Sequence, residues 1–409
     1  MDAHLHLPRL RHLSRRLLAL PLCAGLAAPA GAGTLGDTLA DNPARIAPAG
    51  LRVQADARVD AFSDPAPLLR LDDKDWGRHA RSRHALNHAQ LAVQASAGFE
   101  AGGWRLRALT RSGGIATASA DTVTLLGLLN RDEAPGSGTS FDLDYRLNYW
   151  RGDGLSLGHG WHWTPAPGQR LEVGASLQYL GRIELLREVF TGIATPAGAD
   201  RMLFNGQHLR AGNRMRTDDP SRFNPFVREG NPGGHGRALD LGARWTLSER
   251  WQLELAGFDL AARLDGRDMP ESLRVGRFLY DAQGRLIGNA DGSAAVQGQD
   301  RRADLRMHPR ARWLGRLGWQ QHAWQLDVLW QSHAGVREIE LAGRRNLGDS
   351  GYWVGASATA RHAALGLSAG NAWFSAGLTL SNPRAGAART LGAALRLNLP
   401  LPGASPVRD

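Results

Sequence analysis

The sequence has little of the two features that most often hold exported or membrane proteins together, cysteine and long apolar runs. Cys23 is the only cysteine among 409 residues, so the chain cannot form an internal disulfide. No run approaches the roughly 18 apolar residues of a spanning helix, and the mean hydropathy is −0.33. These absences exclude an ordinary helical inner-membrane protein and a secreted domain held by disulfides.

Lysine is almost absent as well. The formal net charge is +10, and Lys74 is the only lysine, so nearly all positive charge comes from arginine. The chain shows no basic and aromatic motif of a nucleic-acid-binding module. We therefore expect no nucleic-acid partner, despite the basic composition.

The N-terminus has the pattern of a secretory signal peptide. Several arginines precede the apolar stretch LLALPLCAGLAA, and small residues follow near Ala30. This pattern predicts a signal peptide over residues 1–32, cleaved after Ala30 or Ala32. Leu22 stands where a lipoprotein signal needs a small residue, so Cys23 is expected to be an apolar part of the signal. The exported chain then has no cysteine and needs another scaffold.

Residues 140–181 show the clearest pattern in the chain. Apolar side chains occupy every second position, as in Phe141, Leu143 and Tyr145, and polar side chains stand between them. Strict alternation with tight turns is typical of consecutive antiparallel strands that have one apolar and one polar face. We interpret the stretch as three strands, with a tight turn at the RGDG sequence of residues 151–154.

Similar alternation over residues 51–399 predicts an all-β fold, a transmembrane antiparallel β-barrel of about 14 strands, within a range of 12 to 16. An N-terminal periplasmic segment is expected at 33–50 and a C-terminal tail at 400–409. The last strand ends at Leu399 without the terminal aromatic residue common in outer-membrane strands. Four single strands are expected at 122–129, 303–319, 323–342 and 352–368, with long loops at 182–236 and 263–302. A bulge is expected at Gly257-Phe258, and an interruption is expected at Pro309.

Two features favour a barrel in the outer membrane over a soluble sandwich. Expected short and long connections alternate, as they do between periplasmic turns and extracellular loops. Tryptophans gather beside the short turns, where an aromatic girdle would meet the membrane interface. The expected interface residues are Trp104, Trp163, Trp245, Trp251, Trp319, Trp324 and Trp373. Outer-membrane lipid, lipopolysaccharide and the barrel assembly machinery are the partners that this location implies.

The chain generally resembles bacterial outer-membrane barrels of the porin type. Within that class, Asn42-Pro43-Ala44 before the first strand is similar to the Asn-Pro-Ala of the outer-membrane fatty-acid transporter family. That resemblance implies 14 strands and an N-terminal hatch. A receptor of the TonB-dependent class is not expected, because no plug domain fits before Leu51.

The inward faces of the expected strands carry more arginines than carboxylates. Arginine suits carboxylate or phosphate recognition, and arginine rings favour anions in pores. The simpler interpretation is a polar interior in which arginines and carboxylates pair with one another. The expected pore-lining residues are Arg105, Arg107, Arg111, Arg146, Arg244, Arg306, Arg310, Arg312, Arg316, Arg396, Asp142 and Asp144.

Enzyme signals are weak. Gly348-Asp349-Ser350-Gly351 looks like a protease nucleophile motif, but it stands in an expected turn. No Cys/His spacing suits a metal, so no metal, cofactor or catalytic residue is expected.

Three hypotheses remain. The first is a pore for polar, mainly anionic, solutes or an acidic polymer. The second is a transporter of hydrophobic ligands with a hatch and an apolar pocket near residues 34–50. The third is an outer-membrane enzyme or assembly factor that uses 182–236 or 263–302.

Overall fold

The computed structural model describes residues 35–401 except 49, 72–75, 132, 134, 137, 199–200, 214–232, 282–285, 290–296 and 362. The expected signal peptide, with Cys23, and most of the expected C-terminal tail lie outside the described residues. None of the described helices is long and apolar enough to cross a membrane.

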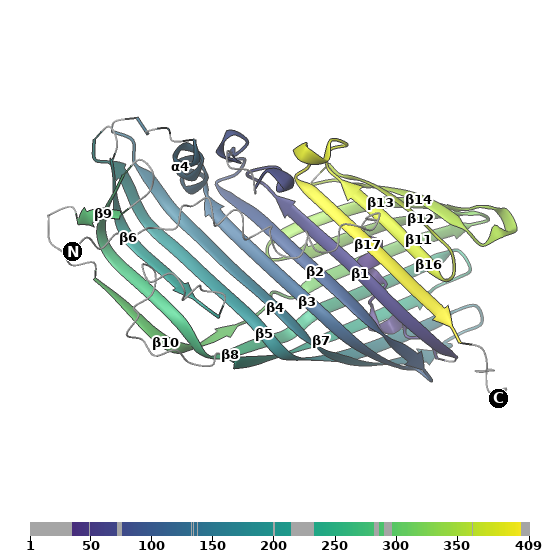
Figure 1. Cartoon of the computed structure of the whole chain (residues 1–409). Coiled ribbons are helices and arrows are strands. Elements are labelled where there is room, and N and C mark those ends of the chain that lie inside the picture. The colour runs from purple at the N-terminus through teal and green to yellow at the C-terminus, as the bar shows by residue number, and fades with distance from the viewer. Residues whose placement is uncertain are drawn as a thin grey trace.

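All described strands belong to one antiparallel sheet that closes on itself, because β1 pairs with both β2 and β17. The strands run steeply tilted around the barrel (Figure 1). They are β1 Leu51–Ser63, β2 Leu86–Ala101, β3 Trp104–Ser119, β4 Phe141–Trp163, β5 Arg170–Pro196, β6 Arg201–Ala211, β7 Gly233–Thr246, β8 Trp251–Asp281, β9 Leu286–Asn289, β10 Gln297–Met307, β11 Arg312–Gln321, β12 Trp324–His333, β13 Val336–Asn346, β14 Trp353–Thr359, β15 Leu365–Gly370, β16 Phe374–Leu380 and β17 Thr390–Pro400.

Two of the 14 barrel positions are each built from two strands. β6 and β7 both pair with β5 on one side and β8 on the other. β10 and β11 both pair with β8 in the same way. Counting each couple once, and leaving out the short β9, gives a closed barrel of 14 positions.

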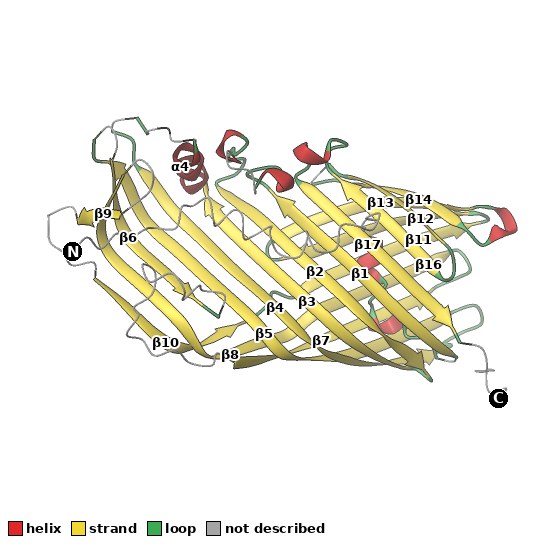
Figure 2. Ribbon diagram, viewed as in Figure 1, coloured by secondary structure: helices red, strands yellow, loops and turns green. Residues whose placement is uncertain are grey.

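The helical segments are short. α4 (Ala120–Asn130) and the 3-10 turns η2 (Leu68–Arg70), η3 (Trp76–Arg78) and η5 (Ala385–Ala387) lie in the connections at one end of the barrel (Figure 2). η4 (Gly348–Ser350) belongs to a connection at the other end, and α3 (Leu35–Leu39) and η1 (Pro43–Arg45) precede the barrel. The connections at the end that holds Leu51 and Pro400 have two to six residues, so this is the periplasmic end.

The expected strand at 122–129 is wrong, because these residues form helix α4. The Ser119 side chain caps the helix by accepting from the Thr122 backbone N–H, and Asp121 stands in the first turn. The run TVTLLGLL is apolar without alternation, so its periodicity does not separate a strand from a buried helix. Four apolar positions of α4 pack on the barrel or remain buried.

The expected turn at residues 151–154 is also wrong, since β4 runs unbroken through it. A side chain at Gly154 would clash with the Tyr179 carbonyl, so glycine here serves close strand pairing and not a turn. The register shifts between Asp153 and Gly154, because Gly181 of β5 is an extra residue. Sequence alone does not separate these two uses of glycine.

The expected long loops at 182–236 and 263–302 are largely strand, because β5 and β8 extend beyond the apolar band. Residues 214–232 of the first loop lie outside the described residues. The expected strands 323–342 and 352–368 are each two strands; the first folds into a hairpin at Ala334-Gly335, both with positive φ. The helix at 122–129 and the unbroken β4 each remove one expected strand, and the divided segments 323–342 and 352–368 each add one. The total therefore remains 14.

Two local predictions are confirmed. The chain breaks between β10 and β11 around Pro309. The register of β7 against β8 shifts beside Gly257-Phe258, where Asp259 and Ala261 have positive φ.

Candidate functional site

The N-terminal segment, defined here as residues 35–48, lies inside the barrel near its periplasmic end. Asn42 caps η1 by accepting from the Ala44 backbone N–H at 3.0 Å, and Pro43 opens the turn. The segment contacts the inner faces of β4, β5 and β7, and Ala44 and Ile46 are buried. The structure therefore places in the lumen a segment that the sequence left irregular and periplasmic.

Three glycines make room for this segment. Gly160, Gly174 and Gly242 are register partners on β4, β5 and β7, so they lie side by side on the inner wall. A Cβ atom at Gly174 would overlap the Pro43 carbonyl, and one at Gly242 would overlap the Asn42 side chain. We call these three residues the glycine platform, and the N-terminal backbone lies directly on it.

Asp41 anchors the segment to one side of the barrel. Its carboxylate lies 2.8 Å from both Arg58 and Arg107, and 3.5 Å from Arg396. Burial alone would raise the pKa of Asp41, but these three guanidinium groups outweigh burial and hold the pKa well below its usual range. Asp41 therefore stays ionised inside the lumen.

Glu254 of β8 anchors the segment to another side. The Arg45 guanidinium donates two hydrogen bonds of 2.6 Å to the carboxylate, and the Asn42 amide donates one of 2.9 Å. Burial would lower the pKa of Arg45, but Glu254 raises it above its ordinary value. The Glu254 side chain is fully buried. The two anchors hold the segment across the lumen.

Eight of the expected pore-lining arginines lie on the inner face, and all eight pair with carboxylates. The pairs are Arg105 with Glu100 at 2.5 Å, Arg107 with Asp41 at 2.8 Å, Arg111 with Asp259 at 2.8 Å, Arg146 with Asp144 at 2.9 Å, Arg244 with Glu172 at 3.1 Å, Arg312 with Asp60 at 3.9 Å, Arg316 with Asp327 at 2.8 Å and Arg396 with Asp41 at 3.5 Å. The buried members of this set form a neutralised ion-pair layer.

The remaining two expected arginines are elsewhere. Arg306 of β10 pairs in register with Asp265, on the outer face of the wall, because the neighbouring Leu305 and Met307 point inward. Arg310 lies exposed in the break between β10 and β11. The prediction kept one alternation of faces across the interruption at Pro309, and the break changes which side chains face the lumen.

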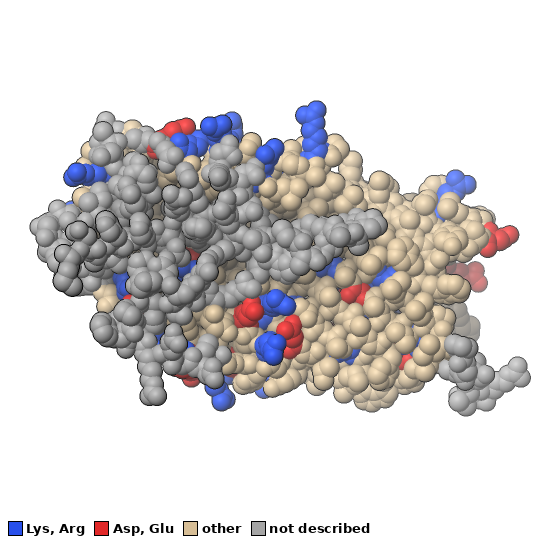
Figure 3. All heavy atoms as spheres, in the orientation of Figure 1, with Lys and Arg blue, Asp and Glu red and all other residues tan. Residues whose placement is uncertain are grey.

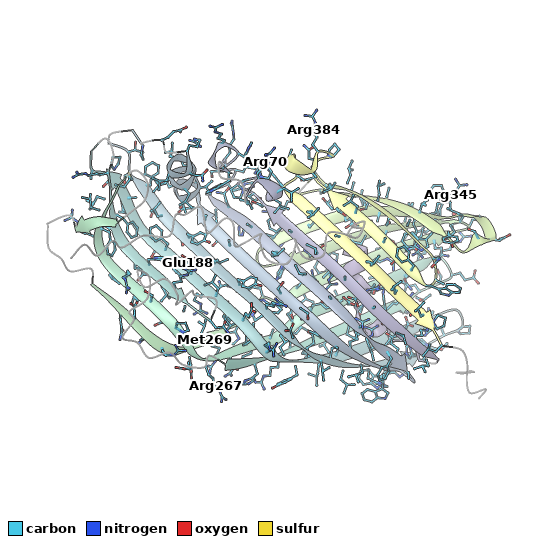
Figure 4. All side chains as sticks on the ribbon, viewed as in Figure 1. Arg70, Glu188, Arg267, Met269, Arg345 and Arg384 are labelled. Atoms are coloured by element: carbon cyan, nitrogen blue, oxygen red, sulfur yellow. The ribbon has the colours of Figure 1, made fainter. Side chains whose placement is uncertain are left out.

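An apolar cluster lines the lumen beyond the ion-pair layer. Trp150 of β4 is in register with Leu185 of β5, and the Arg111 guanidinium lies 5.5 Å from the Trp150 ring. Met269 of β8 is fully buried within the same cluster (labelled in Figure 4). The members of this lumenal apolar cluster are Leu109, Leu180, Ile183, Leu185, Ala211, Leu264, Met269, Leu305 and Met307, with Trp150 against them.

The inner face opens beyond this cluster toward the long-loop end. Ile193 and Val275 are 50% and 41% exposed, although the register places both on the inner face. Asp142 and Asp144 lie there too, with Arg146 paired to Asp144. A molecule entering from this end meets a mixed, solvent-exposed mouth before the apolar cluster.

Sequence reasoning missed the apolar cluster for a specific reason. Gly181 shifts the phase of β5, so the odd-numbered Ile183 and Leu185 face inward where even-numbered residues did before. Because residues 182–236 were interpreted as a loop, this phase change was not considered. The signal was an apolar pair, two residues apart, directly after a glycine at the end of an alternating run.

The expected interface tryptophans all lie at the periplasmic end of the barrel. They stand at strand ends beside the turns 102–103, 164–169, 247–250, 322–323 and 371–373. Trp104, Trp163, Trp245, Trp251, Trp324 and Trp373 are exposed, and Trp319 is half-buried. Above them, the outer faces carry exposed leucines, as a lipid-facing band does.

The described residues contain no group of three or more His, Cys, Asp or Glu side chains placed to hold a metal ion. Gly348-Asp349-Ser350-Gly351 forms η4 and its cap in an exposed turn, and the Ser350 hydroxyl donates to the Leu347 carbonyl. These residues therefore form a turn, as the sequence predicts.

Comparisons with known proteins give likenesses in shape alone. No protein-family model matches the chain, and no curated protein matches it in sequence. Among solved structures, a TodX mutant described as a monoaromatic hydrocarbon channel matches with a TM-score of 0.46 and 11% identity, over 91% of this chain and 96% of its own. The Pseudomonas putida toluene transporter TodX has a TM-score of 0.39 and 10% identity, over 90% and 93%.

A Pseudomonas aeruginosa FadL homologue has a TM-score of 0.36 and 12% identity, over 88% of this chain and 91% of its own. The closed barrel of 14 positions, its apolar outer band and its tryptophan girdle themselves identify the protein as an outer-membrane β-barrel.

Proposed function

We propose that the protein passes small hydrophobic molecules through the outer membrane, and that the N-terminal segment is the hatch of this path. The order of the layers inside the lumen supports this proposal. Along β8, Glu254 holds the N-terminal segment, Asp259 pairs with Arg111, and Leu264 and Met269 then enter the apolar cluster. A solute from outside therefore passes the mixed mouth, then the apolar cluster, and reaches the hatch last.

The expected anionic path has no comparable support. An arginine attracts anions when its charge is not balanced, and each of the eight lumenal arginines has a carboxylate within 4 Å. Asp41 of the hatch itself pairs with two of them, Arg107 and Arg396, and also with Arg58. The arginines serve to hold the hatch and balance buried charge.

The proposal is tested by comparing entry of two dyes into cells with an intact outer membrane. One dye is the neutral, apolar N-phenylnaphthylamine; the other is the anionic, polar nitrocefin with a periplasmic β-lactamase. Cells that make the protein should admit the apolar dye several-fold faster, with nitrocefin hydrolysis unchanged. Faster nitrocefin hydrolysis with unchanged entry of the apolar dye would refute the proposal.

The variant Leu185→Gln tests whether entry uses the apolar cluster. Leu185 is fully buried among the cluster side chains, so an amide there should reduce dye entry to near the background rate. Leu347→Gln is the matched control, because Leu347 lies exposed in the turn between β13 and β14. If both variants admit the dye equally well, the apolar cluster is not on the path.

A further inference from the structure

The outer face of neighbouring strands from β4 to β11 repeats one pattern. Each barrel position begins near the periplasmic end with tryptophan or leucine and continues with a run of mainly exposed apolar side chains that ends in charge; on β4, the buried Tyr149 and Leu147 follow Arg151 on the same face. The charged ends carry five arginines on the outer face: Arg151 on β4, Arg182 on β5, Arg237 on β7, Arg263 on β8 and Arg306 on β10. We call these five residues the arginine belt.

The register fixes the outward direction of the belt. Arg182 is the partner of Asp153, which has the same parity as the exposed Leu155 of β4. Arg237 is paired with the exposed Tyr179 on one side and with Arg263 on the other. Figure 3 shows basic and acidic side chains at the rims, in one compact group and scattered elsewhere over the face in view.

The height of the belt matches the outer lipid head groups. About ten residues separate Trp163 of the periplasmic girdle from Asp153 on β4. Ten residues at about 3.3 Å each, tilted by about 45°, rise about 23 Å. The apolar band of an outer-membrane barrel is about 25 Å tall. The belt therefore lies where phosphate-bearing head groups of the outer leaflet begin.

The belt arginines differ from the lumenal arginines in their partners. Within the described part of the chain, Arg151, Arg182 and Arg237 have neither an ion pair nor a side-chain hydrogen bond. Arg182 and Arg237 are exposed. Arg263 and Arg306 share Asp265, and both use only their Nε atoms, at 2.7 and 3.0 Å. The lumenal set is balanced, whereas the belt has five arginines against Asp153, Glu184 and Asp265.

We propose that the arginine belt binds the phosphate groups of outer-leaflet lipid, such as those of lipid A in lipopolysaccharide. The planar guanidinium fork binds phosphate through two hydrogen bonds, and an arginine that uses Nε for a carboxylate keeps its end-on pair of Nη donors for phosphate. The acyl chains of the same lipid then lie on the apolar band directly below. This inference does not depend on what crosses the lumen.

Native mass spectrometry of the purified full chain with lipid A tests the proposal. The folded protein should retain bisphosphorylated lipid A, and dephosphorylated lipid A should bind at least about tenfold more weakly. The double variant Arg182→Gln, Arg237→Gln should show a similar loss. Its matched control is Arg250→Gln, Arg345→Gln, because both arginines are exposed at the periplasmic end (Arg345 is labelled in Figure 4).

Equal retention of the two lipids, or equal binding by the belt variant and wild type, would overturn the proposal. Heat-dependent gel mobility establishes that each variant is a folded barrel. If the glutamine variant does not fold, Arg182→Lys, Arg237→Lys replaces it. Lysine keeps the positive charge but lacks the two-pronged guanidinium, so this variant should bind lipid A several-fold more weakly than wild type. Undiminished binding by the lysine variant would also contradict the proposal.

Discussion

Gly174 determines whether the N-terminal segment fits against the barrel wall. It lies between Gly160 and Gly242 on the glycine platform, and the Pro43 carbonyl occupies the space of a Cβ atom. The obstacle is backbone on both sides, so rotation of a side chain cannot relieve it. Glycine here is required by packing and not by an unusual φ.

Gly174→Ala should therefore loosen the hatch. Overpacking of this kind costs about 1–3 kcal/mol, so tryptic cleavage after Arg45 should become roughly tenfold faster or more. Mass spectrometry of the digest measures this rate. Gly114→Ala is the control, because a Cβ there meets only ordinary contacts with Tyr149 and Leu91. Equal cleavage of both variants would show that the platform does not hold the hatch.

Glu254 is the acceptor for two residues of the hatch and for Arg316 of the wall. Glu254→Gln leaves Arg45 without its carboxylate partner and Arg316 with Asp327 alone, a loss on the order of 3–5 kcal/mol. The hatch should leave its seat, with faster cleavage after Arg45 and a lower midpoint of thermal unfolding. Glu249→Gln, in the exposed turn 247–250, should change neither. A Glu254 variant with wild-type cleavage would remove this anchor from the account.

The hatch as a unit should respond to strong acid and not to mild acid. The pKa of Asp41 is lowered in the folded protein, since three arginines outweigh the opposing effect of burial. A lowered pKa contributes stability that is complete above the unfolded value, about 3.9, and is lost as pH falls below it. Docking should therefore be constant from pH 8 to 5 and weaken below about pH 4.

Hydrogen–deuterium exchange of the peptide that spans residues 38–48, corrected for the intrinsic rate, measures this response. Asp41→Asn should exchange quickly at pH 7 and lose most of the acid dependence. Loosening of the wild-type hatch between pH 7 and 5 would contradict the assignment of Asp41 as its titrating anchor.

The strands that turn one face toward lipid were predictable from the sequence, and the strand segments that extend beyond the membrane were not. β1, β16 and β17 follow the strands expected at 51–62, 372–381 and 389–399 within one or two residues, because lipid requires apolar residues at every second position. The upper parts of β5 and β8 change phase at Gly181 and at the positive-φ residues Asp259, Ala261 and Asp268, so their broken alternation resembles loop sequence. Helix α4 was missed because its N-cap, Ser119, is also the last residue of strand β3.

The inner charges were mostly predictable by position but not by partner. Alternation placed Arg107 and Arg312 on the inner face, and the structure agrees. It did not show that Asp41, which precedes the barrel, would enter the lumen and pair with Arg107. A pairing between positions far apart in the chain has no local signature, so the balance of the lumen required the fold.

The whole barrel combines a periplasmic hatch, a neutralised ion-pair layer, an apolar cluster and an exposed mouth. The ion pairs hold the hatch in place, and the apolar cluster offers no attraction to a polar anion. On this account the resting barrel is closed to ions, although 14 strands enclose enough space for a channel.

Single-channel recording of the refolded protein in a planar bilayer tests this account most directly. At neutral pH the wild type should show no steady conductance, and Gly174→Ala should add brief openings as the hatch leaves the glycine platform. A steady, anion-selective current through the wild type, unchanged by Gly174→Ala, would contradict a closed lumen and return the arginines to the role of a conducting path.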